Sequence, residues 1–133
     1  MNLNYTLQAA NGIMRASELI ARGHSEHALR KALALGHVTR PQRGWIALVG
    51  TDPQLLQAAQ VGAVLSCVTV ARRLGLWVHR ESELHLAART RTPRVGAGSH
   101  RVHWGRPVRR REPYALVDSI ENALNYVALC QPP

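Results

Sequence analysis

The chain has few residues of the kinds that build disulfide frameworks or acidic catalytic sites. Its 133 residues include two cysteines and eight acidic side chains, against 17 lysines and arginines. Cys67 and Cys130 are too few for the disulfide framework of a small secreted protein. No apolar run approaches the roughly 20 residues that a membrane-spanning helix needs. The first residues, MNLNYTLQ, also lack the basic and apolar regions of a signal peptide. We therefore expect a cytoplasmic protein with no membrane partner.

The shortage of acids leaves a net charge of +9. Such an excess indicates a polyanionic partner, either nucleic acid or an anionic membrane surface. Apolar residues make up 46% of the chain, which is enough to build a packed core and argues against disorder. The length suits one domain or two small lobes.

No arrangement typical of an enzyme or a metal site is visible. Asp118 and Glu121 share a helix face, but the other acids are scattered, so no nuclease-like cluster forms. There is no C-x-x-C and no histidine pair at i, i+4, and His100 and His103 fall on opposite faces of a predicted strand. We therefore predict no enzyme activity, no catalytic residue, no cofactor and no metal ligand. Cys67 is interpreted as a small buried residue.

The first 50 residues predict three short helices followed by a tight hairpin. A helix over 3–10 is followed by a second in ASELIARG, with Leu19 and Ile20 inward, and by a third that Ser25 caps and Gly36 ends. HVTR and WIALV are then short runs of alternating apolar and polar residues, which predict two strands joined by the turn PQRG. This order predicts a winged helix-turn-helix, whose third helix would enter a major groove of DNA.

The third predicted helix has one apolar and one basic side. Leu29 and Leu33 lie on the first, and only Glu26 offsets the bases of the other. A solvated helix normally mixes both signs, which is the alternative interpretation. Arginine and lysine side chains can pair with guanine or neutralise phosphates. The predicted DNA contacts, including two arginines at the hairpin tip, are Ser25, His27, Arg30, Lys31, Arg40 and Arg43.

Residues 51–133 predict a small mixed α/β lobe. PQLLQAAQ and CVTVARRL are short helices, Ser66 caps the second, and ELHLAA and HRVHW alternate as strands. The last helix carries Leu116, Ile120, Leu124 (with Ala123) and Val127 at helical spacing. The predicted fold class is therefore α+β: a winged helix-turn-helix over 1–50 and an α/β lobe over 51–133.

Charge is unevenly spread over this second part. Arg89 to Arg111 contains eight arginines and no acid, whereas the chain after Arg111 contains three acids and no base. The arginines could form a second phosphate-contacting arm or a solvated loop, and those at 109–111 could instead lie against the acidic last helix. We assign Trp45, Trp77 and Trp104 to the core rather than to a base-stacking surface.

Two stretches carry a resemblance to a known family. GIMRASELIARGHSEHALRKALALGHVTRPQRGWIAL, residues 12–48, resembles the N-terminal winged-helix domain of AbiEi-type antitoxins of abortive-infection systems. AVLSCVTVARRLGLW, residues 63–77, is similar to the start of that family's second lobe. The matching positions are Glu18-Leu19, Gly23, Ser25, Leu29, Gly36, Val38, Arg40, Arg43-Gly44-Trp45, Leu48, Leu65-Ser66, Ala71 and Leu74-Gly75-Leu76-Trp77. Arg15 departs from the pattern, because the family usually has a capping threonine there; the change implies a helix start weaker by roughly 1 kcal/mol.

The resemblance implies a DNA-binding, autoregulatory repressor. The same two lobes also head actinobacterial proteins that continue into a domain similar to very-short-patch-repair endonucleases. The tail from His103 to Pro133 is more similar to this second group.

We expect a protein that binds double-stranded DNA and represses transcription. Two alternatives stay open: a DNA-targeting module of an endonuclease-like protein whose catalytic domain is not in this chain, and a protein–protein module. A homodimer and a toxin or nuclease partner also stay open, as do the DNA sequence and the role of the Arg89–Arg111 stretch.

Overall fold

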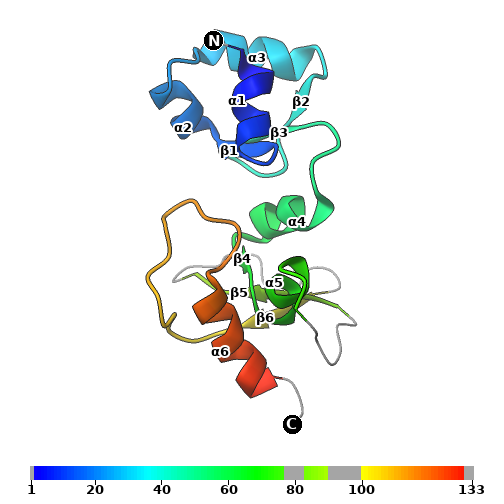
Figure 1. Ribbon diagram of the computed structural model, residues 1–133. Coiled ribbons are helices and arrows are strands. Elements are labelled where there is room, and N and C mark those ends of the chain that lie inside the picture. Colours follow the sequence, from blue (N-terminus) through cyan, green and yellow to red (C-terminus); the bar gives the residue numbers. More distant parts are fainter. Residues whose placement is uncertain (1, 77–82, 90–99, 131–133) are drawn as a thin grey trace. The chain divides into compact units, whose positions relative to one another are not determined.

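The computed structural model describes residues 2–76, 83–89 and 100–130 of the chain (Figure 1). Over these residues it contains six helices and two three-stranded sheets, so the fold is mixed α+β. The chain divides into two compact units, Met1–Ala59 and Gln60–Pro133. The predicted boundary after residue 50 and this division differ only in the placement of helix α4 (Pro53–Val61), which crosses from one unit to the next.

The first unit packs three helices against a small antiparallel sheet. The central strand β3 pairs on one side with β1, where Met14 faces Ile46, and on the other with β2, where Val38 faces Leu48. The elements in chain order are α1 (Leu3–Ala9), β1 (Ile13–Arg15), α2 (Ala16–Ala21), α3 (Glu26–Ala34), β2 (Val38–Thr39) and β3 (Trp45–Leu48).

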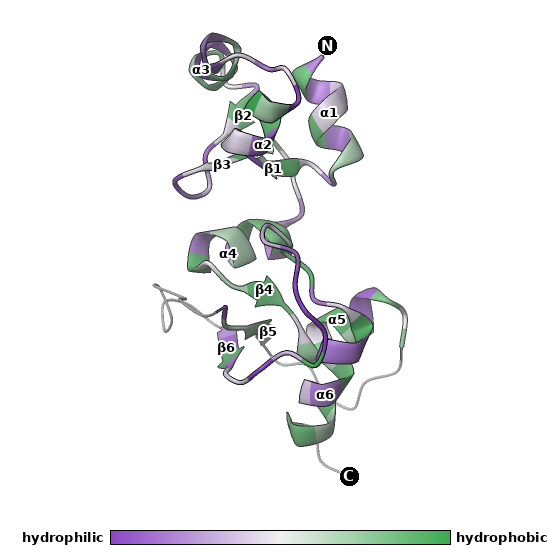
Figure 2. Cartoon of the chain, turned by 90° about the vertical axis from the view of Figure 1, so that its left-hand side faces the viewer, coloured by the Kyte–Doolittle hydropathy of each residue, from purple (hydrophilic) through white to green (hydrophobic). Residues whose placement is uncertain are grey.

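One apolar side chain or more from each of these elements enters a common core. Partly buried neighbours, among them Ala32 and Leu33 of α3, pack against it. Figure 2 accordingly colours α3 as a mixture of hydrophilic and hydrophobic residues. The buried members are Leu7, Met14, Leu19, Leu29, Val38 and Ile46.

Local signals explain where these helices begin and end. The Ser25 side chain accepts a hydrogen bond of 3.0 Å from the backbone N–H of Ala28, as predicted for a helix cap. Gly36 follows the end of α3 at a φ of 77°, a left-handed conformation that glycine adopts without strain. Arg15 occupies the start of α2 and makes no side-chain cap there, in line with the expected weak start.

Only one of the two apolar residues predicted to face inward from α2 does so. Leu19 is fully buried, but Ile20 is 42% exposed, so that part of the prediction was wrong. Consecutive residues of a helix point about 100° apart, and on α2 it is Leu19 that faces the core.

The second unit packs two helices against a second sheet. Its central strand β5 pairs antiparallel with β4 and parallel with β6, where His85 faces Arg101 and Ala87 faces His103. Side chains of β4, β5, α5 and α6 form the core there. The elements of this unit are β4 (Val64–Leu65), α5 (Cys67–Arg73), β5 (Leu84–Ala87), β6 (His100–His103) and α6 (Ile120–Cys130). The predicted loop over 90–99 lies outside the described residues.

The face of α6 that meets the core matches the prediction only in part. Leu116 and Ala123 are buried and Val127 packs against the core, as expected, but Ile120 and Leu124 are exposed. Asn122 and Tyr126 are buried in their place. The helix is therefore rotated toward a face that includes polar groups, because Asn122 makes buried hydrogen bonds that the apolar pattern does not reveal.

Two further expectations need correction. Ser66 precedes α5, but its hydroxyl donates to Asp118 and makes no cap. Trp104 is 61% exposed, so its assignment to the core was wrong. Trp45 is buried as expected, and Trp77 lies outside the described residues.

Candidate nucleic-acid interface

The outward face of α3 presents the predicted contact residues to solvent. Of the predicted set, Ser25, His27, Arg30 and Lys31 are all exposed, and they lie at the start and middle of α3. Leu29, between them in sequence, is 5% exposed and belongs to the core. The 3.6-residue period thus separates an apolar face from a basic one, as the sequence predicts.

A buried polar contact fixes the start of α3. His24 is 6% exposed, and its Nε2 lies 3.0 Å from the hydroxyl of Thr6 on α1. The backbone N–H of His24 also donates to the carbonyl of Leu19 at 3.1 Å. The turn between α2 and α3 is therefore held from both neighbouring helices. His24 carries no sequence signal for this role, since an isolated histidine in a turn is usually solvated.

The β2–β3 connection carries the other two predicted contacts. Arg40 and Arg43 are both exposed, at opposite ends of this short turn. Gly44 closes it at a φ of 87°, and a Cβ built there would lie 2.9 Å from Nη1 of Arg15. The Arg15 guanidinium in turn stands 5.3 Å from the ring centroid of Trp45. The Arg15 side chain of β1 thus packs against the end of the turn, at Gly44 and Trp45.

These exposed groups offer complementary chemistry to nucleic acid. Guanidinium groups make bidentate hydrogen bonds to phosphate or to the edge of guanine, and an ammonium group neutralises phosphate charge. The first turn of α3 contains Glu26, the only acid between Ser25 and Leu48. The surface is therefore cationic over both α3 and the turn.

The arginines between Arg89 and Arg111 are in part bound within the second unit. Arg89 donates to the backbone carbonyls of Glu112 and Ala115. Arg109 forms an ion pair of 2.8 Å with Glu121, although both side chains are well exposed, so the pair adds little to stability. For these arginines the contacts support the alternative that they hold the chain against the C-terminal helix and the segment before it.

Arg111 forms a buried ion pair with Asp118 in the second unit. Its Nη2 and Nε donate to the two carboxylate oxygens of Asp118 at 2.9 and 3.0 Å. Ser66 and Asn122 donate to the same carboxylate, each at 2.8 Å. Burial alone would raise the pKa of Asp118, but the hydrogen bonds from Arg111, Asn122 and Ser66 outweigh it and lower that pKa. Asp118 is therefore a charged, fully engaged structural group.

Exposed bases also surround Trp104 in the second unit. Trp104, Arg106 and Arg110 line a hollow of about 510 Å³, together with Arg89 and Arg111. Arg106 and Arg110 are both exposed. The alternative that the Arg89–Arg111 stretch makes a second phosphate contact therefore stays a prediction.

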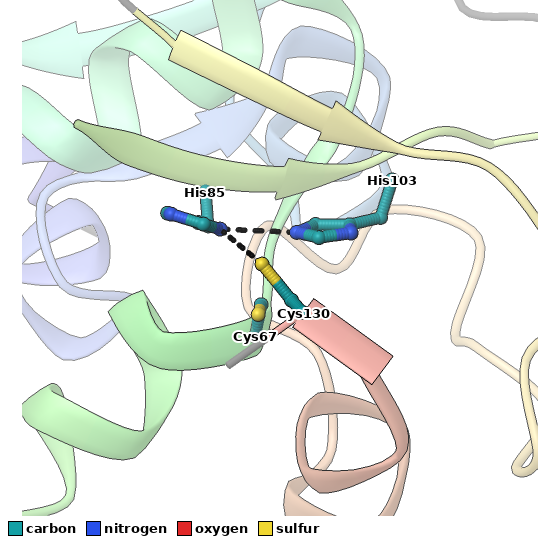
Figure 3. Close-up of side chains that lie close together, drawn as sticks. All are labelled: Cys67, His85, His103 and Cys130. Atoms are coloured by element: carbon teal, nitrogen blue, oxygen red, sulfur yellow. Dashed lines mark hydrogen bonds between the residues drawn. The ribbon is translucent and has the colours of Figure 1, made fainter. Parts of the chain in front are cut away.

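The second unit also gathers two cysteines and two histidines that the sequence did not group. The ligand atoms of Cys67, His85, His103 and Cys130 all lie within 4.8 Å of one another (Figure 3). Burial raises the pKa of Cys67 to about 12, and burial, followed by the neighbouring His85 and Arg101, lowers the pKa of His103 to about 4. The prediction of no metal ligands relied on local spacing, which cannot detect a cluster spread over four elements.

No protein-family model matches the chain, and no curated protein matches it. Among the described residues, no helix combines the length and the apolar character that crossing a membrane requires.

Proposed function

We propose that the first unit binds double-stranded DNA as a winged helix-turn-helix. In this proposal α3 enters the major groove, and the turn between β2 and β3 is the wing that reaches the adjacent backbone. The protein would act as a transcriptional repressor, in the manner that its resemblance to AbiEi-type antitoxins implies.

The order and pairing of the elements support this proposal. Helix α1, strand β1 and the consecutive helices α2 and α3 precede the hairpin of β2 and β3, and β3 lies between β1 and β2 in the sheet. In a helix-turn-helix the second of two consecutive helices contacts the bases. Here that helix is α3, which follows α2 after the short turn of Gly23 to Ser25.

The observation that carries the proposal is the separation of apolar and basic side chains on α3. Leu29 anchors the helix in the core, while the neighbouring Arg30 and Lys31 stay exposed. The exposed face of a helix that only covers a core usually carries both acidic and basic side chains, whereas the exposed face of α3 is almost entirely basic. The exposed bases of the wing, Arg40 and Arg43, extend the same charge beyond the helix.

Each residue then has a role that suits its chemistry. His27, Arg30 and Lys31 would contact base edges in the major groove. Arg40 and Arg43 would hold phosphate or enter the minor groove, where arginine binds a narrow groove well. Ser25 at the helix N-terminus would donate its hydroxyl proton to a phosphate, while its oxygen keeps the cap.

A repressor of its own operon is the biological form of this activity that we favour. A single winged helix seldom buries enough surface for tight specific binding, so we propose that a homodimer occupies the operator. The alternative, a targeting module of an endonuclease-like protein, shares the same contacts but requires no operator preference.

The test is a fluorescence-anisotropy titration of the full chain against two duplexes. One carries the DNA upstream of the protein's own gene, and the other carries the same bases in scrambled order. The titration is repeated over a salt series, because log affinity falls with log salt by a slope of about 0.9 for each phosphate contact.

A steep salt slope with tighter binding to the upstream duplex is the expected result. Equal, weak binding to both duplexes would favour a non-specific anchor such as the nuclease module. No binding to either duplex at low salt would overturn the proposal and leave α3 as a solvated helix.

A further inference from the structure

Four side chains from four different elements converge in the core of the second unit. Cys67 begins α5, His85 lies within β5, His103 ends β6 and Cys130 ends α6. Figure 3 shows the four side chains pointing toward a common point between the strands and the helix ends. Cys67 and His85 are buried, and His103 and Cys130 are partly buried.

The sheet register places the two histidines together. In the parallel pairing of β5 and β6, His85 lies opposite Arg101 and Ala87 lies opposite His103. Side chains two positions apart on a strand share a face, so His85 and His103 are diagonal neighbours on one face of the sheet. Their rings stack with centroids 5.2 Å apart, and His85 Nδ1 lies 3.0 Å from His103 Nε2.

The helices bring the two sulfur atoms to the same place. Cys67 and Tyr126 belong to the core that covers this sheet, and Cys130 lies one turn beyond Tyr126 on the same face of α6. The Sγ atom of Cys130 lies 3.9 Å from Nδ1 of His85. Tyr126 also packs its ring at 5.1 Å from that of His103.

These distances suit a tetrahedral metal ion. Zinc binds sulfur at about 2.3 Å and imidazole nitrogen at about 2.0 Å, which places neighbouring ligand atoms about 3.3 to 3.8 Å apart. The nitrogen–nitrogen distance of 3.0 Å between His85 and His103 and the sulfur–nitrogen distance of 3.9 Å between Cys130 and His85 lie close to that range. Shifts of less than about 1 Å would bring the remaining pairs within it.

An ordinary core does not account for this cluster. The nitrogen atoms of His85 and His103 face each other and the sulfur of Cys130 instead of water, an arrangement in which four metal-binding atoms meet in one place. Apolar side chains would fill the same space without the cost of burying polar groups. Cys67 also adopts a φ of 53°, a left-handed conformation that is rare outside glycine and that collects at functional positions.

We propose that Cys67, His85, His103 and Cys130 bind one zinc ion. The protein supplies all four ligands of a tetrahedron and leaves no position for a substrate, so the site is structural rather than catalytic. Bound zinc would join the two helices to strands β5 and β6 and stabilise the second unit, whose sheet is small. This inference does not depend on DNA binding and can fail or hold separately from it.

The first test measures metal in the full chain without any substitution. Elemental analysis of protein purified under reducing conditions is expected to give about one zinc per chain. Titration of the zinc-depleted protein with Co²⁺ is expected to give the intense visible bands of tetrahedral cobalt and a sulfur-to-cobalt charge-transfer band. Protein that contains no zinc when purified under reducing conditions and that gives only weak octahedral cobalt bands without the sulfur transition would overturn the proposal.

Variants then identify the ligands. Cys130→Ser and His103→Gln each remove one of the less buried ligand atoms and are expected to weaken zinc affinity by about 100-fold or more. His100→Gln on the same strand lies outside the cluster and is expected to retain zinc as the wild type does. Equal zinc retention by all three variants would contradict the assignment, and the Co²⁺ spectrum of the wild type decides the matter if a variant fails to fold.

Discussion

The Nε2 atom of His24 lies 3.0 Å from the hydroxyl of Thr6 in the interior of the first unit. This contact joins α1 to the residue that directly precedes the Ser25 cap of α3. The hydroxyl of Thr6 also donates to the carbonyl of Asn2 at 3.2 Å. The start of the proposed recognition helix is therefore held by a chain of polar contacts that runs to the N-terminal residues.

His24→Ala is expected to lower the free energy of unfolding by about 1 to 3 kcal/mol. The substitution removes a buried hydrogen bond and leaves a cavity beside Thr6. Urea unfolding followed by circular dichroism measures the change. The matched control is His37→Ala, an exposed histidine in the same unit, which should shift stability by no more than about 0.5 kcal/mol. Equal effects of the two substitutions would show that the His24 contact is not stabilising.

Ser25→Ala is expected to cost about 1 kcal/mol of stability through the lost cap of α3. Ser25→Asn should cost much less, because an asparagine side chain accepts a hydrogen bond from the same backbone N–H groups. Thermal unfolding of the two variants and the wild type makes the comparison. If both substitutions cost the same, the hydroxyl of Ser25 would not be acting as a helix cap.

The Arg111–Asp118 pair predicts a dependence of stability on pH. The pKa of Asp118 is lowered in the folded protein, since its hydrogen bonds outweigh the effect of burial. The stabilisation is complete above the unfolded pKa of about 3.9 and is lost as the pH falls through the lower folded value. The free energy of unfolding should therefore fall as the pH is lowered from about 5 to about 2.

Asp118→Asn should remove that part of the acid dependence. At pH 7 the variant is expected to be less stable by about 3 kcal/mol, because it leaves the partly buried Arg111 without its counter-ion. The difference between variant and wild type should shrink as the pH falls. Urea unfolding at several pH values measures both curves, and curves that stay parallel down to about pH 2 would contradict the assigned pKa direction.

Most of the first unit could be predicted from the sequence, because its signals are local. Ser25 precedes a helix, Gly36 ends it, and Leu29 recurs at the period that marks the buried face. The exposure of His27, Arg30 and Lys31 follows from the same period. The failure at Ile20 has a geometric cause, since Ile20 points about 100° away from Leu19, the residue of α2 that enters the core.

The second unit was predicted less well because its decisive contacts are remote in sequence. Buried Asn122 donates hydrogen bonds to Asp118 and to the backbone carbonyl of Arg109. These bonds orient α6 so that Leu124, which the apolar pattern places on the core, is exposed. The Cys and His cluster depends on the parallel register of β5 and β6, which no local spacing encodes.

The most direct test of the DNA-binding proposal compares two double variants with the same loss of charge. Arg30→Ala with Lys31→Ala removes the bases of α3, and Arg106→Ala with Arg110→Ala removes two exposed bases of the second unit. Alanine keeps the helix propensity of α3, so folding should persist.

Anisotropy titration of both variants and the wild type on the upstream duplex gives the answer. The α3 variant should bind about 100-fold more weakly and lose its preference over scrambled DNA, since each base contact contributes about 1 to 3 kcal/mol. The control variant should lose much less affinity and keep the preference. Equal losses in the two variants would contradict the assignment of α3 as the recognition helix.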